Sequence, residues 1–87
     1  MMTKPVNVMK RSTSVIRVIN ALHDFFQENS TIDNNRVYAS TRDIADLSEL
    51  SIYNTRHILI KLEKEGIISS VKQRKGLYWN KTEKFVL

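Results

Sequence analysis

The sequence predicts an α+β fold in which three helices are accompanied by a small antiparallel sheet, and three observations support this prediction. Apolar residues recur at helical spacing over residues 15–26. Two further helical segments, separated by only residues 48–50, occupy residues 41–65. Two segments rich in β-forming residues then flank a glycine-containing turn. With 87 residues, of which 41% are hydrophobic, the chain is long enough for one compact domain.

Composition and charge narrow the class of protein. The chain has no cysteine, so disulfides and thiolate metal sites are impossible and a reducing, cytoplasmic setting is expected. The first residues lack the apolar core of a signal peptide, and no apolar run approaches membrane-spanning length. The net charge is +3 over residues 1–14, −3 over residues 15–50 and +5 over residues 51–87. A basic half beside an acidic one is typical of polyanion-binding proteins, and a merely solvated basic surface is the alternative.

The N-terminal part is expected to be a flexible arm followed by a scaffold helix. Residues 1–13 contain the only proline, Pro5, and no apolar periodicity. Two alternatives remain for the cations of this arm: they contact DNA phosphates, or the arm is a disordered segment without a role. The helix after the arm has Ser12 or Ser14 as its N-cap, and His23 lies on its surface side. Its apolar stripe consists of Val15, Ile16, Val18, Ile19, Leu22, Phe25 and Phe26.

A polar loop and a short strand lead to the next helix. Residues 29–36 are polar, and Asn34 or Asn35 is suited to a left-handed turn conformation. Residues 36–40 are expected to form a short strand with Val37 and Ala39 on one side and Tyr38 on the other.

Residues 41–68 are typical of a helix-turn-helix. The first helix begins at Ser40 or Thr41, either of which can accept a hydrogen bond from a first-turn N–H. It is expected to place Ile44, Ala45 and Leu47 inward. The turn after it is so short that the two helices cannot lie antiparallel and must cross steeply, as in DNA-reading helix-turn-helix motifs.

The second helix of the pair runs from a cap at Ser51 to about Glu65, and Gly66 ends it in a left-handed conformation. Its inward side is expected to carry Thr55, Ile58, Leu59 and Leu62, with Ile52 at the margin. Its outward side carries aromatic, amide, imidazole, apolar and cationic groups, of the kinds that contact base edges or phosphates. These outward residues are Tyr53, Asn54, Arg56, His57, Ile60, Lys61 and Lys64.

A β-hairpin is predicted after this helix. Residues 67–72 and 77–80 are its strands, and the basic turn around Arg74 and Lys75 ends in glycine. Trp79 is too large to be exposed at low cost, so we expect it to close the core. A hairpin that directly follows a recognition helix is the wing of a winged helix-turn-helix. That domain is expected over residues 14–81, followed by a C-terminal tail over residues 82–87 that extends the strand or frays.

No constellation of catalytic or cofactor-binding residues is present, so the chain is not expected to be an enzyme. Two histidines without cysteine give no metal-ligand spacing, and two glycines give no phosphate-binding loop. Asp43 and Asp46 lie three positions apart, and we interpret them as exposed residues that complement a helix N-terminus. No cofactor, metal or small-molecule substrate is therefore expected.

The segments T-R-D-I-A-D and L-S-I-Y-N-T-R-H-I-L-I-K-L-E-K-E-G-I-I, followed by R-K-G and Y-W, carry a family resemblance. Over residues 40–79 the chain resembles the small winged-helix regulators of fimbrial operons, the FaeA/PapI-like family, which includes plasmid-borne members. The L-S-x-Y-x-x-R segment and the R-x-G…Y-W ending are the more specific parts. Tyr53, Arg56, Arg74 and Lys75 match the family's motif.

The resemblance implies transcriptional control of adhesin genes, often as phase variation, together with a leucine-responsive regulatory protein at sites that overlap adenine-methylation sequences. The chain departs from the pattern at three places. Glu49 stands in the turn where many helix-turn-helices have glycine, which costs about 1 kcal/mol if that residue is left-handed. Thr55 replaces a usual Val or Ile, and the N-terminal arm is longer than expected.

The leading hypothesis is a cytoplasmic, nucleoid-associated regulator that binds double-stranded DNA as a monomer or weak dimer. One alternative is an adaptor that docks on another regulator's DNA complex through Tyr53 and Ile60, with little DNA affinity of its own. Another is an ordinary homodimeric repressor. The base-reading candidates are Tyr53, Asn54, Arg56 and His57. The phosphate-binding candidates are Ser40, Thr41, Arg42, Lys61, Lys72, Arg74 and Lys75.

Overall fold

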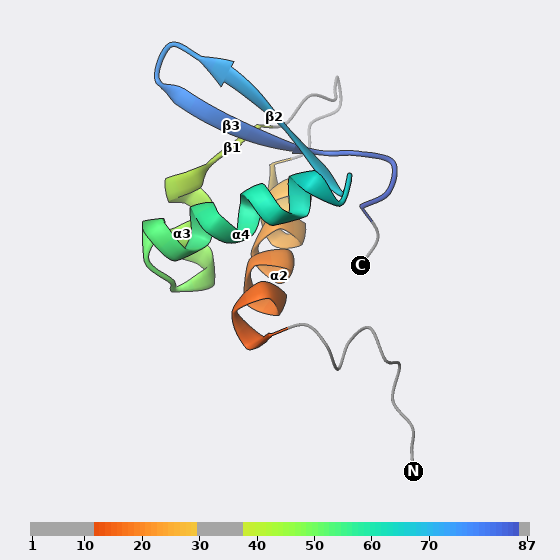
Figure 1. Cartoon of the computed structure of the whole chain (residues 1–87). Coiled ribbons are helices and arrows are strands. Elements are labelled where there is room, and N and C mark those ends of the chain that lie inside the picture. Colours follow the sequence, from red (N-terminus) through yellow and green to blue (C-terminus); the bar gives the residue numbers. More distant parts are fainter. Residues whose placement is uncertain (1–11, 30–37, 86–87) are drawn as a thin grey trace.

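The computed structural model describes residues 12–29 and 38–85, which form three helices and a three-stranded antiparallel sheet (Figure 1). The strand order is β1-β3-β2, so the hairpin strand β3 is central. The β2–β3 hairpin projects past the helices above α3 and the start of α4 (Figure 1). The predicted α+β architecture is confirmed. In chain order, the elements are α2 (Thr13–Glu28), β1 (Ala39–Ser40), α3 (Thr41–Ser48), α4 (Ile52–Lys64), β2 (Ile68–Gln73) and β3 (Gly76–Lys81).

Some sequence predictions fall on residues that are not described. These are residues 1–11 of the arm predicted over residues 1–13, the turn at Asn34 or Asn35, and the place of Val37 in the first strand.

Serine side chains begin all three described helices. The Oγ atoms of Ser12, Ser40 and Ser51 accept hydrogen bonds from the backbone N–H three residues later, at 3.2, 3.0 and 3.0 Å. Each bond satisfies a donor that has no partner within the helix. In α3, Asp43 accepts in return from the backbone N–H of Ser40 at 3.2 Å, which completes a capping box. Asp43 is therefore part of the cap itself.

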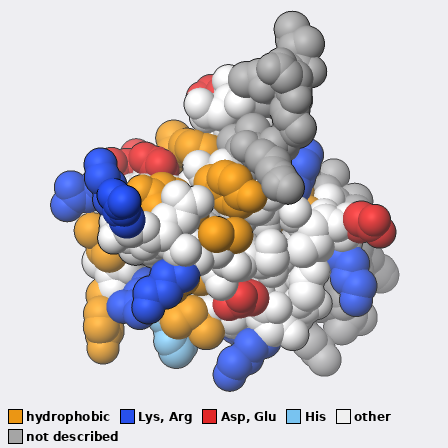
Figure 2. All heavy atoms as spheres, turned by 90° about the horizontal axis from the view of Figure 1, so that it is seen from above, with side chains coloured by type: hydrophobic (Ala, Val, Ile, Leu, Met, Phe, Trp, Pro, Cys, Tyr) orange, Lys and Arg blue, Asp and Glu red, His pale blue; other side chains and the backbone are white. Residues whose placement is uncertain are grey.

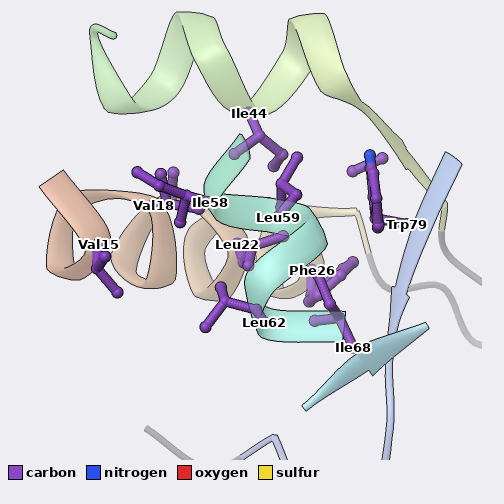
Figure 3. Packing of buried hydrophobic residues seen from close by; sticks show 12 residues of the cluster. Val15, Val18, Leu22, Phe26, Ile44, Ile58, Leu59, Leu62, Ile68 and Trp79 are labelled. Atoms are coloured by element: carbon purple, nitrogen blue, oxygen red, sulfur yellow. The ribbon is translucent and has the colours of Figure 1, made fainter. Parts of the chain in front are cut away.

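One apolar core joins the three helices to the sheet (Figure 3). Leu22 of α2, Leu59 and Leu62 of α4, and Trp79 of β3 have no exposed surface. Their burial is the main favourable contribution to folding for a chain of this size. Trp79 closes the core as predicted. The remaining members are Val15, Val18, Ala21, Phe26, Ala39, Ile44, Ile58 and Ile68.

The prediction that Leu47 points inward is wrong, because this side chain is 47% exposed. The buried residues of α3 are Ile44, Ala45 and Ser48, which lie at i, i+1 and i+4 and so share one side of the helix. Leu47 lies about 100° of helical rotation from Ser48 and is carried to the solvent side.

The first strand ends at the predicted residue, and the hairpin is slightly longer than predicted. Within the described residues, Ala39 and Ser40 pair with β3, opposite Trp79 and Tyr78, whereas Tyr38, which was predicted to belong to the strand, lies outside it. The strand ends at Ser40 because this residue becomes the cap of α3. Relative to the prediction, β2 is shifted by one residue toward the turn, to Ile68–Gln73. The other strand, β3, is one residue longer at each end and covers Gly76–Lys81.

The residues after β3 turn back onto the end of α4. The Thr82 hydroxyl donates to the carbonyl oxygens of Gly66 and Ile67, at 2.6 and 3.0 Å. The Phe85 ring then packs edge-on against Phe26, with the ring centroids 5.7 Å apart. These contacts attach residues 82–85 to the core.

Candidate nucleic-acid interface

Helix α4 divides into a buried and an exposed side as the periodicity predicts. Thr55, Ile58, Leu59 and Leu62 are buried. Tyr53 is 86% exposed, and Ile60 is 37% exposed. The polar and cationic residues predicted to face outward are also exposed, namely Asn54, Arg56, His57, Lys61 and Lys64.

The turn before α4 is held by a side chain from the scaffold helix. Glu49 has the left-handed backbone angles φ 61° and ψ 37°, which cost an L-residue about 1–2 kcal/mol. From α2, Arg17 donates from Nε to the Ser48 carbonyl oxygen and from Nη2 to the Glu49 carboxylate, both at 3.0 Å. This cation also faces the carbonyl end of α3, where positive charge is favourable. Arg17 thus connects α2 to the segment that orients α4.

Sequence reasoning missed the role of Arg17. The partners are 31 and 32 residues apart along the chain, and no local pattern pairs them. The only available signal was the Glu49 carboxylate at a position that favours glycine, because a charged residue there needs a partner to compensate its backbone cost.

The wing carries its cations at the tip of the hairpin. Lys72, Arg74 and Lys75 are exposed, and Arg74 and Lys75 form the two-residue turn between the strands. Gly76 follows with φ 135°, a region that residues with a Cβ seldom adopt. Figure 2 shows several Lys and Arg side chains on the left of the molecule, interspersed with hydrophobic side chains.

A groove of about 320 Å³ separates the first turn of α4 from the wing. Arg56 and Lys72 contribute the cations of this groove, and none of the described residues that line it is acidic. Neither cation forms an ion pair with any residue in the described ranges. The other lining residues are Thr41, Ile52, Gly76 and Leu77.

The predicted phosphate contacts at the start of α3 are partly engaged within the fold. The Ser40 hydroxyl accepts the capping hydrogen bond described above. Thr41 Oγ1 accepts a 3.0 Å hydrogen bond from the buried Trp79 Nε1, which leaves the hydroxyl hydrogen to be donated elsewhere. The Arg42 side chain is exposed.

A second, smaller hollow of about 240 Å³ lies on the outward side of α4. His57, Ile60, Lys61 and Lys64 line it. The structure thus brings the predicted partner residue Ile60 together with three basic or imidazole side chains, whereas Tyr53 lines neither hollow.

The carboxylates near this surface are few. Over residues 51–81 they are Glu63 and Glu65, and Glu63 accepts a 2.6 Å hydrogen bond from the Ser70 hydroxyl of β2. Within residues 12–29 and 38–85, no cluster of three or more His, Cys, Asp or Glu side chains is arranged to hold a metal ion. None of the helices in those ranges is both long and apolar enough to span a membrane.

Three helices, of which α3 and α4 are joined by a short turn, and a hairpin that follows α4 define a winged helix-turn-helix domain with a basic, partly apolar exposed surface. The family model described as FaeA-like protein matches residues 11–81, and the chain belongs to this family. A comparison with curated proteins gives no match. Membership in this regulator family, which is not an enzyme family, supports a role in the control of a fimbrial operon.

Proposed function

We propose that the protein is a DNA-binding transcriptional regulator of a fimbrial operon. In this proposal, the outward side of α4 enters the major groove of double-stranded DNA with Tyr53, Asn54, Arg56 and His57 nearest the bases. The surrounding hydroxyls and cations contact the phosphates on either side. These are Ser40, Thr41, Arg42, Lys61, Lys72, Arg74 and Lys75.

The observation that carries this proposal is the charge of the surface formed by α4 and the wing. This surface has six exposed cations, Arg56, Lys61, Lys64, Lys72, Arg74 and Lys75. Cations that surround aromatic, amide and imidazole groups suit a nucleic acid. The cations can contact its phosphate backbone, and the other groups can contact the edges of its bases. The family resemblance adds a cytoplasmic location on the nucleoid, phase variation as the regulated behaviour and a plasmid-borne gene as one setting.

A second candidate function is favoured by the apolar groups on the same surface. Tyr53 is 86% exposed, and Ile60 sits among cations, an arrangement more typical of a protein contact than of a solvated helix. In this alternative, the protein docks on the DNA complex of the leucine-responsive regulatory protein and has little DNA affinity alone.

A mobility-shift titration separates the two candidates. The probes are a duplex that the wild-type chain selects from a random-sequence pool and the control region of a fimbrial operon, each tested with and without the leucine-responsive regulatory protein. Direct binding predicts a shift by this chain alone, which is weakened in the Lys72→Ala variant. The adaptor function predicts a shift only in the presence of the second protein, with the larger loss in Ile60→Ala.

The Lys84→Ala variant is the matched control for charge. Lys84 is exposed and lies next to Gly66, just after the C-terminal end of α4. The groove lies near the N-terminal end of this helix. Its substitution removes the same charge as Lys72→Ala and is expected to leave both shifts unchanged.

A further inference from the structure

The groove between α4 and the wing has the chemistry of a site for one nucleotide unit of a DNA backbone. Ile52 and Leu77 contribute apolar walls, and Arg56 and Lys72 contribute positive charge. The deoxyribose of DNA presents mostly C–H surface and is attached to an anionic phosphate, and this combination matches both features. No carboxylate lines the groove to compete for the cations.

The Thr41 hydroxyl adds a directed donor to this site. Its oxygen accepts the N–H of Trp79, whose side chain is fully buried, so the core fixes the position of that oxygen. No acceptor of the Thr41 hydroxyl hydrogen is found in the described part of the chain. The hydrogen is therefore available to an acceptor within the groove.

Gly76 keeps the wing side of the groove open. A Cβ built at this residue would have no heavy atom within 4 Å, so the missing side chain leaves space at the groove rather than relieving a contact within the fold. Backbone at such a position can approach a sugar-phosphate chain closely.

We infer that Arg56, Lys72 and the Thr41 hydroxyl together hold a single phosphate, whose deoxyribose lies against Ile52 and Leu77. This inference rests on the proposed DNA binding and deepens it, because it assigns Arg56 to the DNA backbone. The outward position of Arg56 on α4 had suggested that it reads a base. Sequence recognition then belongs to Tyr53, Asn54 and His57.

The first test compares the Arg56→Ala variant on two duplexes, the one selected by the wild-type chain and an unrelated one. A phosphate contact predicts that affinity falls about tenfold on both, because a charge-assisted hydrogen bond is lost whatever the sequence. A loss confined to the selected duplex, with relaxed preference at one base pair, overturns the inference. Absence of wild-type binding to any duplex overturns the proposed function as well.

The second test asks whether Arg56 and Lys72 act on the same phosphate. A scan that replaces single phosphates by uncharged methylphosphonates is expected to reveal one position that weakens wild-type binding about tenfold. At this position the replacement should weaken Arg56→Ala and Lys72→Ala by clearly less than tenfold, because each variant has already lost one of the two cations that contact the phosphate. Lys75→Ala, which removes a wing cation outside the groove, should still lose about tenfold at that position. Separate positions for Arg56 and Lys72 contradict the inference.

Discussion

The two sides of α4 differ in what the fold requires of them. The inner side consists of Thr55, Ile58, Leu59 and Leu62, all buried against the other helices and the sheet. The outer side makes no contact that the core depends on, yet beside its cations it carries an aromatic ring, an imidazole and an exposed isoleucine, whereas a solvated helix more often carries Glu, Lys and Ala. Substitutions should therefore separate into those that change stability and those that change binding.

The largest effect is expected from shortening an inner residue. Leu59→Ala should lower the free energy of unfolding by about 3 kcal/mol, since it leaves a cavity in the centre of the core. Urea unfolding measures this loss. Ile60→Ala, the adjacent outward residue, should change it by less than about 1 kcal/mol. Equal losses for the two variants would contradict the division of α4.

The next largest effect on stability is expected at the turn between α3 and α4, which orients the two sides of α4. Arg17→Ala should cost about 1 kcal/mol of unfolding free energy, because it removes one hydrogen bond and a partly exposed ion pair. Glu49→Gly should instead gain about 0.5 kcal/mol, since relief of the left-handed backbone outweighs the lost ion pair.

Denaturant unfolding of the two variants and their double variant checks this balance. In the double variant, the Glu49→Gly gain should be larger than in the wild-type chain, because no ion pair is left to lose. A destabilised Glu49→Gly variant would mean that the left-handed conformation carries no strain here.

A substitution on the inner side should stabilise the protein. The Thr55 Oγ1 atom is buried and has no hydrogen-bond partner among residues 12–29 and 38–85, which is unfavourable in an apolar environment. Thr55→Val replaces this hydroxyl by a methyl group of similar shape and should raise the free energy of unfolding by about 1 kcal/mol. Thr55→Ser is the control, because it keeps the hydroxyl and should not stabilise. A less stable Thr55→Val variant would show that the hydroxyl has a partner in solution.

The smallest effects on stability belong to the outer side. Tyr53→Ala and His57→Ala should each change the free energy of unfolding by less than about 0.5 kcal/mol, since both side chains are exposed. Their affinity for the selected duplex should nevertheless fall by about 1–3 kcal/mol, and less on an unrelated duplex. Thermal unfolding together with a binding titration measures both quantities. Unchanged affinity in both variants would remove them from the base-reading set.

The sequence alone predicted the features that local rules govern. The two sides of α4 follow from helical periodicity. The preference of helix N-termini for hydroxyls predicted the cap at Ser51 and left two candidates for each of the other helices, of which Ser12 and Ser40 are the caps. The left-handed conformation of Glu49 was suspected because glycine is common in such turns. Trp79 was placed in the core because of its size.

What the sequence missed depends on contacts between distant segments. Leu47 was placed inward because it is apolar, but the way α3 packs on α2 and α4 decides which side is buried. Arg17 reaches a turn 31 residues away, and the groove brings Arg56 of α4 beside Lys72 of the wing. Such neighbours are determined by the tertiary fold rather than by spacing along the chain.

The salt dependence of DNA binding by the full chain tests the central claim most directly. If the exposed cations of α4 and the wing neutralise about four phosphates, the logarithm of the affinity should fall against the logarithm of the salt concentration with a slope of about −4. The Lys84→Ala control should keep that slope. A flat dependence between about 50 and 200 mM salt would contradict the assignment of this surface to the DNA backbone.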